Sequence, residues 1–232
     1  GGSLAGEVLV NGVPTVNSSM AELAERVGTV MEDYESQLVA MTVEEEVAFA
    51  LENQGLKREA IAQQVKEVLN LTGLSGLDKW SVADLSGGQK QRLVIAGVLA
   101  AKPDILVLDE PASALDPEGT ENLYTLLGSL NQEHGITVVV VEHDLARVLA
   151  YADQFVLLMA GKLVQVGTAG EVLTHMWQQQ EFCEAVPPLW QLKLSLEATE
   201  GVRFADWQTE QQAIVELQQY LGAHQEGESR SA

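Results

Sequence analysis

The sequence predicts an α/β protein with a parallel core sheet, an antiparallel β element and a helical subdomain. Residues 105–108 and 137–141 are continuous apolar runs, which are typical of parallel strands covered on both faces. Residues 118–133 between them have a helical pattern and suit the crossover that joins two parallel strands. Near the start of the chain, Asn11-Gly12 separates two short apolar stretches, the pattern of a two-residue hairpin turn.

The remaining elements follow in chain order. A short helix is expected over residues 21–27, and a strand over 28–31 that runs into an acidic loop. Thr42 and Glu45 have the spacing of a capping box, and apolar residues at helical intervals follow them. A second helix is expected over residues 58–71, with a glycine two residues later as its stop. These two helices indicate a small helical subdomain.

After Leu85 the pattern changes to alternating helices and strands. Residues 155–159 and 162–166 flank Ala160-Gly161 and predict a closing hairpin, and a Gln-rich helical stretch begins at Glu171. We therefore predict four segments. They are a β element with its acidic loop (1–40), the helical subdomain (41–85), the core (86–170) and a C-terminal helical extension with a tail (171–232).

Composition narrows the class of protein. The chain has 232 residues, 46% of them hydrophobic, which is enough for a substantial core. A formal net charge of −21 argues against a surface that neutralises nucleic-acid phosphates, so we expect no nucleic-acid partner. No apolar run approaches the roughly 18 to 20 residues that span a bilayer, and no secretory signal opens the sequence. A cytoplasmic location is the expectation.

A candidate anion site lies at the start of a predicted helix. Ser86, Gly87 and Gly88 come directly before residues that continue with helical periodicity. A helix start offers unpaired amides and the positive end of the helix dipole, and Ser86 adds a hydroxyl. An isolated Gly-Gly would be an ordinary turn, so this signal depends on its neighbours in the sequence.

Two carboxylates follow the buried strand at residues 105–108. Asp109 and Glu110 would lie at the carboxyl end of that strand, where open α/β sheets bind ligands. Asp109 is a candidate for Mg²⁺, and Glu110 for orienting or deprotonating a water. His143 ends the next strand and could donate a hydrogen bond to a phosphate. Each of these residues taken alone would more often be structural.

Together the motifs resemble those of ABC ATPases. LSGGQKQR, ILVLDEP, SALD and VVVEHD are similar to the signature, Walker B, D-loop and switch-histidine motifs of that family. GEVLVNG and SQLVAMTVEEEVAFALEN resemble more narrowly the ATPase subunits of energy-coupling-factor transporters, which import vitamins and metal ions. The resemblance covers about residues 5–170 and implies a P-loop NTPase-like core sheet.

The resemblance also implies roles for individual residues. ATP held by the opposing subunit would be contacted by Ser86, Gly87, Gly88 and Gln89. Asp109 would serve Mg²⁺, Glu110 would be the catalytic base, and Asp116 would bridge the dimer. His143 would sense the γ-phosphate. The implied cofactors are ATP and Mg²⁺.

The sequence departs from the family pattern in two places. No lysine is followed by Ser or Thr, so the Walker A pattern Gly-x-x-x-x-Gly-Lys-Ser/Thr is missing. We expect that a truncation removed it upstream and that the chain alone is nearly inactive. Glu32 stands where the family places a glutamine, and it is a candidate Mg²⁺ contact, with a solvent-exposed acid as the alternative. Tyr34 replaces a common proline.

Three functions remain in order of preference. The first is a transport ATPase at the cytoplasmic face of the membrane, paired with a second ABC ATPase subunit and a transmembrane subunit. The second is a degenerate, non-hydrolysing half that completes a partner's site or regulates it. The third, an ABC ATPase acting on DNA or ribosomes, predicts basic patches that this acidic sequence lacks.

Overall fold

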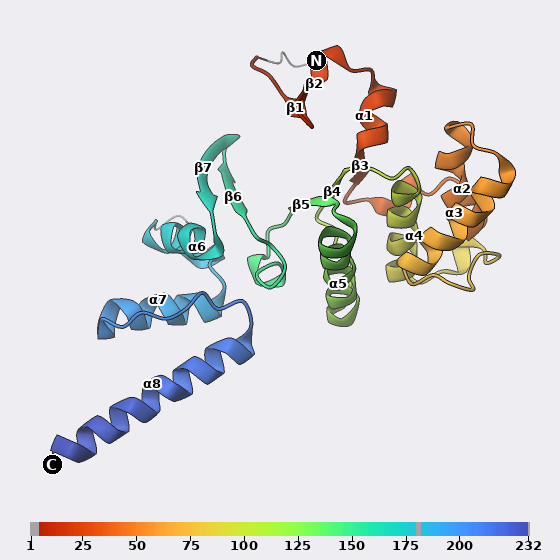
Figure 1. Ribbon diagram of the computed structural model, residues 1–232. Helices are drawn as coiled ribbons and strands as arrows, with labels where there is room; N and C mark the ends of the chain where they lie inside the picture. Colours follow the sequence, from red (N-terminus) through yellow and green to blue (C-terminus); the bar gives the residue numbers. More distant parts are fainter. Residues whose placement is uncertain (1–4, 180–181, 232) are drawn as a thin grey trace. The chain divides into compact units, whose positions relative to one another are not determined.

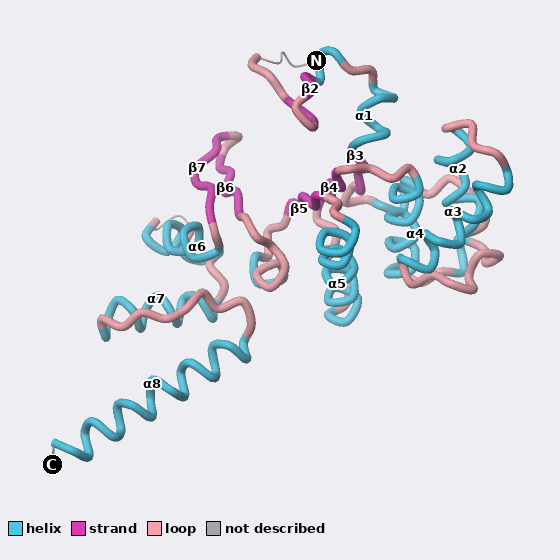
Figure 2. Tube along the Cα trace, in the orientation of Figure 1, coloured by secondary structure: helices cyan, strands magenta, loops and turns pink. Residues whose placement is uncertain are grey.

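The computed structural model describes residues 5–179 and 182–231, with side chains to residue 222 (Figures 1 and 2). The chain forms two compact units, Gly1–Glu142 and His143–Ala232. Each unit is described by itself. The four segments that the sequence predicts have other boundaries than these two units, and they stay a prediction.

The first unit contains the parallel sheet that the sequence predicts. Its strands are β3 (Val27–Val30), β4 (Ile105–Asp109) and β5 (Thr137–Val141), paired in the order β3-β4-β5 (Figure 2). Both pairings are parallel. Leu106 and Leu108 of β4 are fully buried. In β5, Val139 and Val141 are 45% and 52% exposed, and the cover expected on both faces of this strand stays a prediction.

The described part of this unit contains five α-helices. They are α1 (Met20–Arg26), α2 (Val43–Asn53), α3 (Arg58–Leu71), α4 (Gly87–Ala100) and α5 (Pro117–His134). Val47, Leu51, Leu93 and Ile95 are fully buried where α2 and α4 pack together. α4 also packs on β3 so closely that a Cβ added to Gly28 would lie 2.1 Å from Val98 Cγ1. Glycine at position 28 therefore permits the approach of helix and sheet.

The predicted hairpin opens the described chain. Strands β1 (Leu9–Val10) and β2 (Val13–Pro14) are antiparallel. Asn11 and Gly12 have φ angles of 49° and 76°, the left-handed pair that this kind of turn requires. Asn11 Nδ2 also donates a hydrogen bond to Asp104 Oδ2 at 2.7 Å, which ties the turn to the residue before β4.

The second unit begins with another hairpin. Strands β6 (Phe155–Met159) and β7 (Lys162–Gly167) pair antiparallel about Ala160 and Gly161, as the sequence predicts. Helices α6 (Ala169–Gln178), α7 (Pro188–Glu200) and α8 (Glu210–Ser231) follow. The tail expected at the end of the segment 171–232 is wrong as far as residue 231, because α8 continues to Ser231. Short 3-10 turns are Thr15–Asn17, Tyr34–Gln37, Val82–Asp84, Leu145–Arg147 and Cys183–Ala185.

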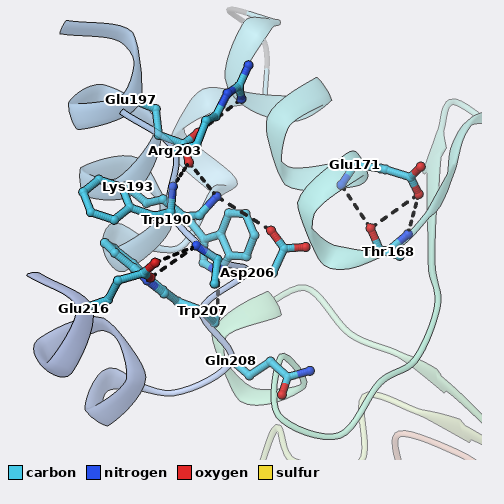
Figure 3. Close-up of polar contacts among 12 residues, drawn as sticks. Thr168, Glu171, Trp190, Lys193, Glu197, Arg203, Asp206, Trp207, Gln208 and Glu216 are labelled. Atoms are coloured by element: carbon cyan, nitrogen blue, oxygen red, sulfur yellow. Dashed lines mark hydrogen bonds and ion pairs between the residues drawn. The ribbon is translucent and has the colours of Figure 1, made fainter. Parts of the chain in front are cut away.

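Two tryptophans form the centre of the second unit. Trp190 of α7 donates a hydrogen bond from Nε1 to the carbonyl of Trp207 at 2.8 Å, and both side chains are almost fully buried (Figure 3). Lys193 lies with its Nζ 4.5 Å from the centre of the Trp190 ring and 3.2 Å from Glu197 Oε1. Trp207 Nε1 donates to Glu216 Oε2 at 2.6 Å. This part of the C-terminal extension is therefore a packed core.

Among the described residues, no helix is both long enough and apolar enough to cross a bilayer.

Candidate nucleotide site

Helix α4 begins where the anion site was predicted. Ser86 is its N-cap and forms a reciprocal capping box with Gln89, whose amide donates to Ser86 Oγ at 3.3 Å. In return, Gln89 Oε1 accepts a hydrogen bond from the Ser86 amide at 2.9 Å. Ser86 and Gly87 are exposed. The helix start is thus open to solvent, with Gln89 stabilising it, and its contact with a nucleotide stays a prediction.

The loop that follows β3 packs against this helix start. Lys90 of α4 places its Nζ 3.2 Å from both carboxylate oxygens of Glu35. Tyr34 is only 7% exposed, and a Cβ added to Gly87 would lie 3.3 Å from its Oη. Burial raises the pKa of Tyr34 above its ordinary value, and the negative charge of Glu35 acts in the same direction. The only sequence signal for Tyr34 was its departure from the family's proline.

Glu32 and Asp109 lie at the same edge of the sheet. Val30 at the end of β3 pairs in parallel with Leu108, so the residues that follow these two strands emerge together. Both carboxylates are exposed. Gln37 fixes the loop of Glu32, because it accepts from the Met31 amide at 2.8 Å and donates to the Thr29 carbonyl at 3.1 Å. The sequence analysis missed this role of Gln37.

Glu110 has an unusual backbone. Its φ angle is 42°, in the left-handed region that costs a non-glycine residue about 1 kcal/mol or more. Its amide donates to the Val141 carbonyl at 3.0 Å, and its carbonyl accepts from the Ser113 amide at 3.1 Å. Strain of this kind persists only where the surroundings hold it, and it gathers at functional sites. The surroundings thus hold Glu110 in this conformation, and its role as the catalytic residue stays a prediction.

Asp116 is the N-cap of α5. Its Oδ1 accepts a hydrogen bond from the Gly119 amide at 2.7 Å, and Pro117 occupies the first turn. The side chain is exposed. Asp116 therefore has a structural role within the chain, and the dimer contact that the resemblance implies stays a prediction.

His143 is the first residue of the second unit, and its side chain is exposed. The next residue, Asp144, caps a 3-10 turn by accepting from the Ala146 amide at 3.2 Å and pairs with Arg147 at 3.0 Å. A phosphate contact of His143 stays a prediction.

Among the predicted site residues, the structure brings Glu32, Asp109 and Glu110 to one edge of the sheet.

A second missed residue anchors the start of the helical subdomain. Glu46 is 8% exposed and accepts from the amides of Val39 and Ala40 at 2.9 and 2.7 Å. Its carboxylate therefore holds a loop whose own apolar side chains point outward, since Val39 and Met41 are 64% and 81% exposed. The sequence analysis missed the buried position of Glu46, because an acidic run such as residues 44–46 is typical of a solvent-exposed surface.

The carboxylates at the sheet edge can supply part of the coordination shell of a magnesium ion. Within the described chain, no group of three or more His, Cys, Asp or Glu residues could hold a metal ion. Mg²⁺ bound together with a nucleotide uses one or two carboxylates and completes its shell with water and phosphate oxygens. Asp109 and Glu32 are exposed carboxylates and fit that donor set.

Comparisons with known proteins identify the family and the fold. A family model described as ABC transporter matches residues 3–113. The structure of cbiO1 from Clostridium perfringens, part of the ABC transporter complex cbiONQ, has a TM-score of 0.66 and 31% identity, covering 76% of this chain and 74% of that one. A dimeric ATP-binding cassette in a post-hydrolysis state, bound to ADP and Pi, has a TM-score of 0.61 and 29% identity, covering 71% and 73%.

Curated relatives carry matching names. The energy-coupling factor transporter ATP-binding protein EcfA of Methanocaldococcus jannaschii is 40% identical over 74% of this chain and 62% of its own length. A protein of Pyrococcus abyssi, named as an ABC transporter ATP-binding protein, is 44% identical over 80% of this chain. The chain belongs to the ATP-binding proteins of ABC transporters, which have the P-loop NTPase fold. It spans 65% of the Pyrococcus relative's length.

Proposed function

We propose that this chain is the ATP-binding and ATP-hydrolysing part of an energy-coupling-factor importer that takes up a vitamin or a metal ion. The observation that carries the proposal is the strained backbone of Glu110 at the carboxyl end of β4. The relative named EcfA and the likeness to cbiO1 support the type of importer.

Each site residue has a chemical task in this proposal. Asp109 and Glu32 would hold Mg²⁺, which neutralises phosphate charge when it is bound. Glu110 orients the attacking water and accepts its proton. The open start of α4 offers Ser86 and two glycine amides to the γ-phosphate of ATP that an opposing subunit holds. His143 would donate a hydrogen bond to that phosphate.

Partners follow from the same proposal. A second ABC ATPase subunit would supply the opposing site, and a transmembrane subunit would receive the movement at the cytoplasmic face of the membrane. Exposed apolar side chains support the second contact. Met31, Val39, Met41 and Phe49 are between 51% and 81% exposed, on or beside the loop that Glu46 anchors.

One observation favours a second function. The sequence lacks the Walker A pattern, and Glu32 adds a negative charge where the family has a neutral glutamine. A non-hydrolysing half that only completes a partner's site would tolerate both features. The presence of Glu110 and His143 supports the hydrolysing form.

The experiment compares the chain with a form extended upstream of Gly1 by a segment that carries a Walker A loop. We expect only the extended form to bind Mg-ATP and to release phosphate. Exchange of Glu110 for Gln in the extended form should leave binding intact and lower kcat by about 100-fold or more. If neither form hydrolyses ATP, the non-hydrolysing function replaces the first proposal.

A further inference from the structure

Tyr34 has an almost fully buried side chain, and its hydroxyl makes no hydrogen bond to any residue of the described ranges 5–179 and 182–231. The side chain is only 7% exposed. Its Oη lies beside the backbone of Gly87, since a Cβ added there would be 3.3 Å away. The hydroxyl is therefore a hydrogen-bond donor without a protein partner beside the start of α4, where it is available to a ligand.

The position of this hydroxyl is fixed by its neighbours. Tyr34 begins the 3-10 turn Tyr34–Gln37, and Gln37 ties that turn to β3 through hydrogen bonds to Met31 and Thr29. Glu35 pairs with Lys90 on the first turns of α4 at 3.2 Å. The loop is thus held at both ends, against the sheet and against the helix.

The place to which the hydroxyl points is an open helix start. Ser86 and Gly87 are exposed, and the amides of the first turn after the N-cap have no partner within the helix. The amide of Gln89 is the exception, because it already donates to Ser86 Oγ. The two glycine amides and the serine hydroxyl belong to this helix start, and the phenol lies beside Gly87. All of them can donate a hydrogen bond to an anion.

We propose that Tyr34 Oη is a further hydrogen-bond donor to the terminal phosphate of the nucleotide received at the start of α4. This inference rests on the proposed function and adds a residue to its site. A neutral donor suits this position. The adjacent residue, Glu35, already carries a charged carboxylate, and a second charged side chain beside it would need a counter-charge of its own. The raised pKa of Tyr34 keeps the phenol protonated throughout the neutral range.

The test is Tyr34→Phe in the upstream-extended form, which removes one oxygen and keeps the ring. Because the hydroxyl has no described protein partner, the urea midpoint should not change. The KM for Mg-ATP should rise about tenfold, the loss expected for one hydrogen bond to a charged group, while affinity for Mg-ADP stays the same. Tyr220→Phe, the same deletion in the second unit, is the matched control and should alter neither ATP constant.

The outcomes separate the inference from the function on which it rests. If the unmodified extended form fails to bind or hydrolyse ATP, the proposed function and this inference both fall. If it is active and Tyr34→Phe has the same KM for Mg-ATP, the inference alone is overturned. Equal losses for ATP and ADP, together with a lower urea midpoint, would assign Tyr34 a structural role and would also overturn it.

Discussion

Gln91 of helix α4 donates its side-chain amide to the carbonyl oxygen of Pro111, the residue after Glu110. Gln91 is 1% exposed, and Pro111 is buried as well. The helix that begins at Ser86 is therefore joined, within one chain, to the turn that carries the candidate catalytic carboxylate. Both ends of this hydrogen bond are buried, so water cannot take the place of either partner.

Exchange of Gln91 for Leu should test that connection. The change leaves the buried Pro111 carbonyl without its donor, which costs about 1 to 3 kcal/mol of unfolding free energy. Urea denaturation of the chain as it stands measures this loss. Gln64→Leu is a matched control, because Gln64 also donates to a carbonyl, that of Ala100, but from a half-buried position. A Gln91 variant no less stable than this control would show that the connection is unimportant.

The strain at Glu110 predicts opposite effects on stability and activity. Glycine adopts the observed φ of 42° without steric cost, so Glu110→Gly should stabilise the chain by up to about 1 kcal/mol. The same variant should lose turnover in the upstream-extended form. Glu110→Gln keeps the strain, so it should lose turnover without gaining stability. Equal unfolding midpoints for Glu110→Gly and Glu110→Gln would contradict a steric cost of the left-handed backbone at this position.

Asp116 should have a measurable capping contribution. Replacement by Ala removes the hydrogen bond to the Gly119 amide and should destabilise the chain by about 1 kcal/mol. Asp116→Asn retains an acceptor of similar geometry and should lose much less. Thermal unfolding of the two variants compares them directly. If the proposed dimer contact needs the charge, Asn should nevertheless weaken ATP-dependent association of the extended form.

The buried Lys193 should contribute more to the free energy of unfolding than an exposed lysine does. Its side chain is 5% exposed, and Lys193→Met would leave the 9% exposed Glu197 without its nearest cation (Figure 3). We expect a loss of up to about 3 kcal/mol, since breaking a buried ion pair is expensive. Glu197 would keep the Phe204 amide at 2.9 Å and the exposed Arg203 at 3.7 Å. The double variant Lys193→Met with Glu197→Gln should recover part of it. Lys79→Met, at a pair that is largely exposed, should change the urea midpoint little. A small effect at Lys193 would contradict this account.

Local signals in the sequence determined the elements of this protein and its family. The Asn11-Gly12 turn, the serine before α4 and the apolar runs of β4 and β5 depend on neighbours a few residues away. The motif residues were visible for the same reason, because each motif is a short contiguous stretch. Their roles toward ATP remain predictions that the experiments above address.

The tertiary structure decided what those signals could not. Tyr34 and Gly87, or Gln91 and Pro111, meet only when helix, loop and sheet pack together. The acidic run 44–46 gave no indication that Glu46 is the one that turns inward. Trp190 and Trp207 became core residues because α7 and the loop before α8 bury them together. Burial and hydrogen bonding between distant residues depend on the whole packing arrangement, whereas turns, caps and strand patterns depend on the local chain.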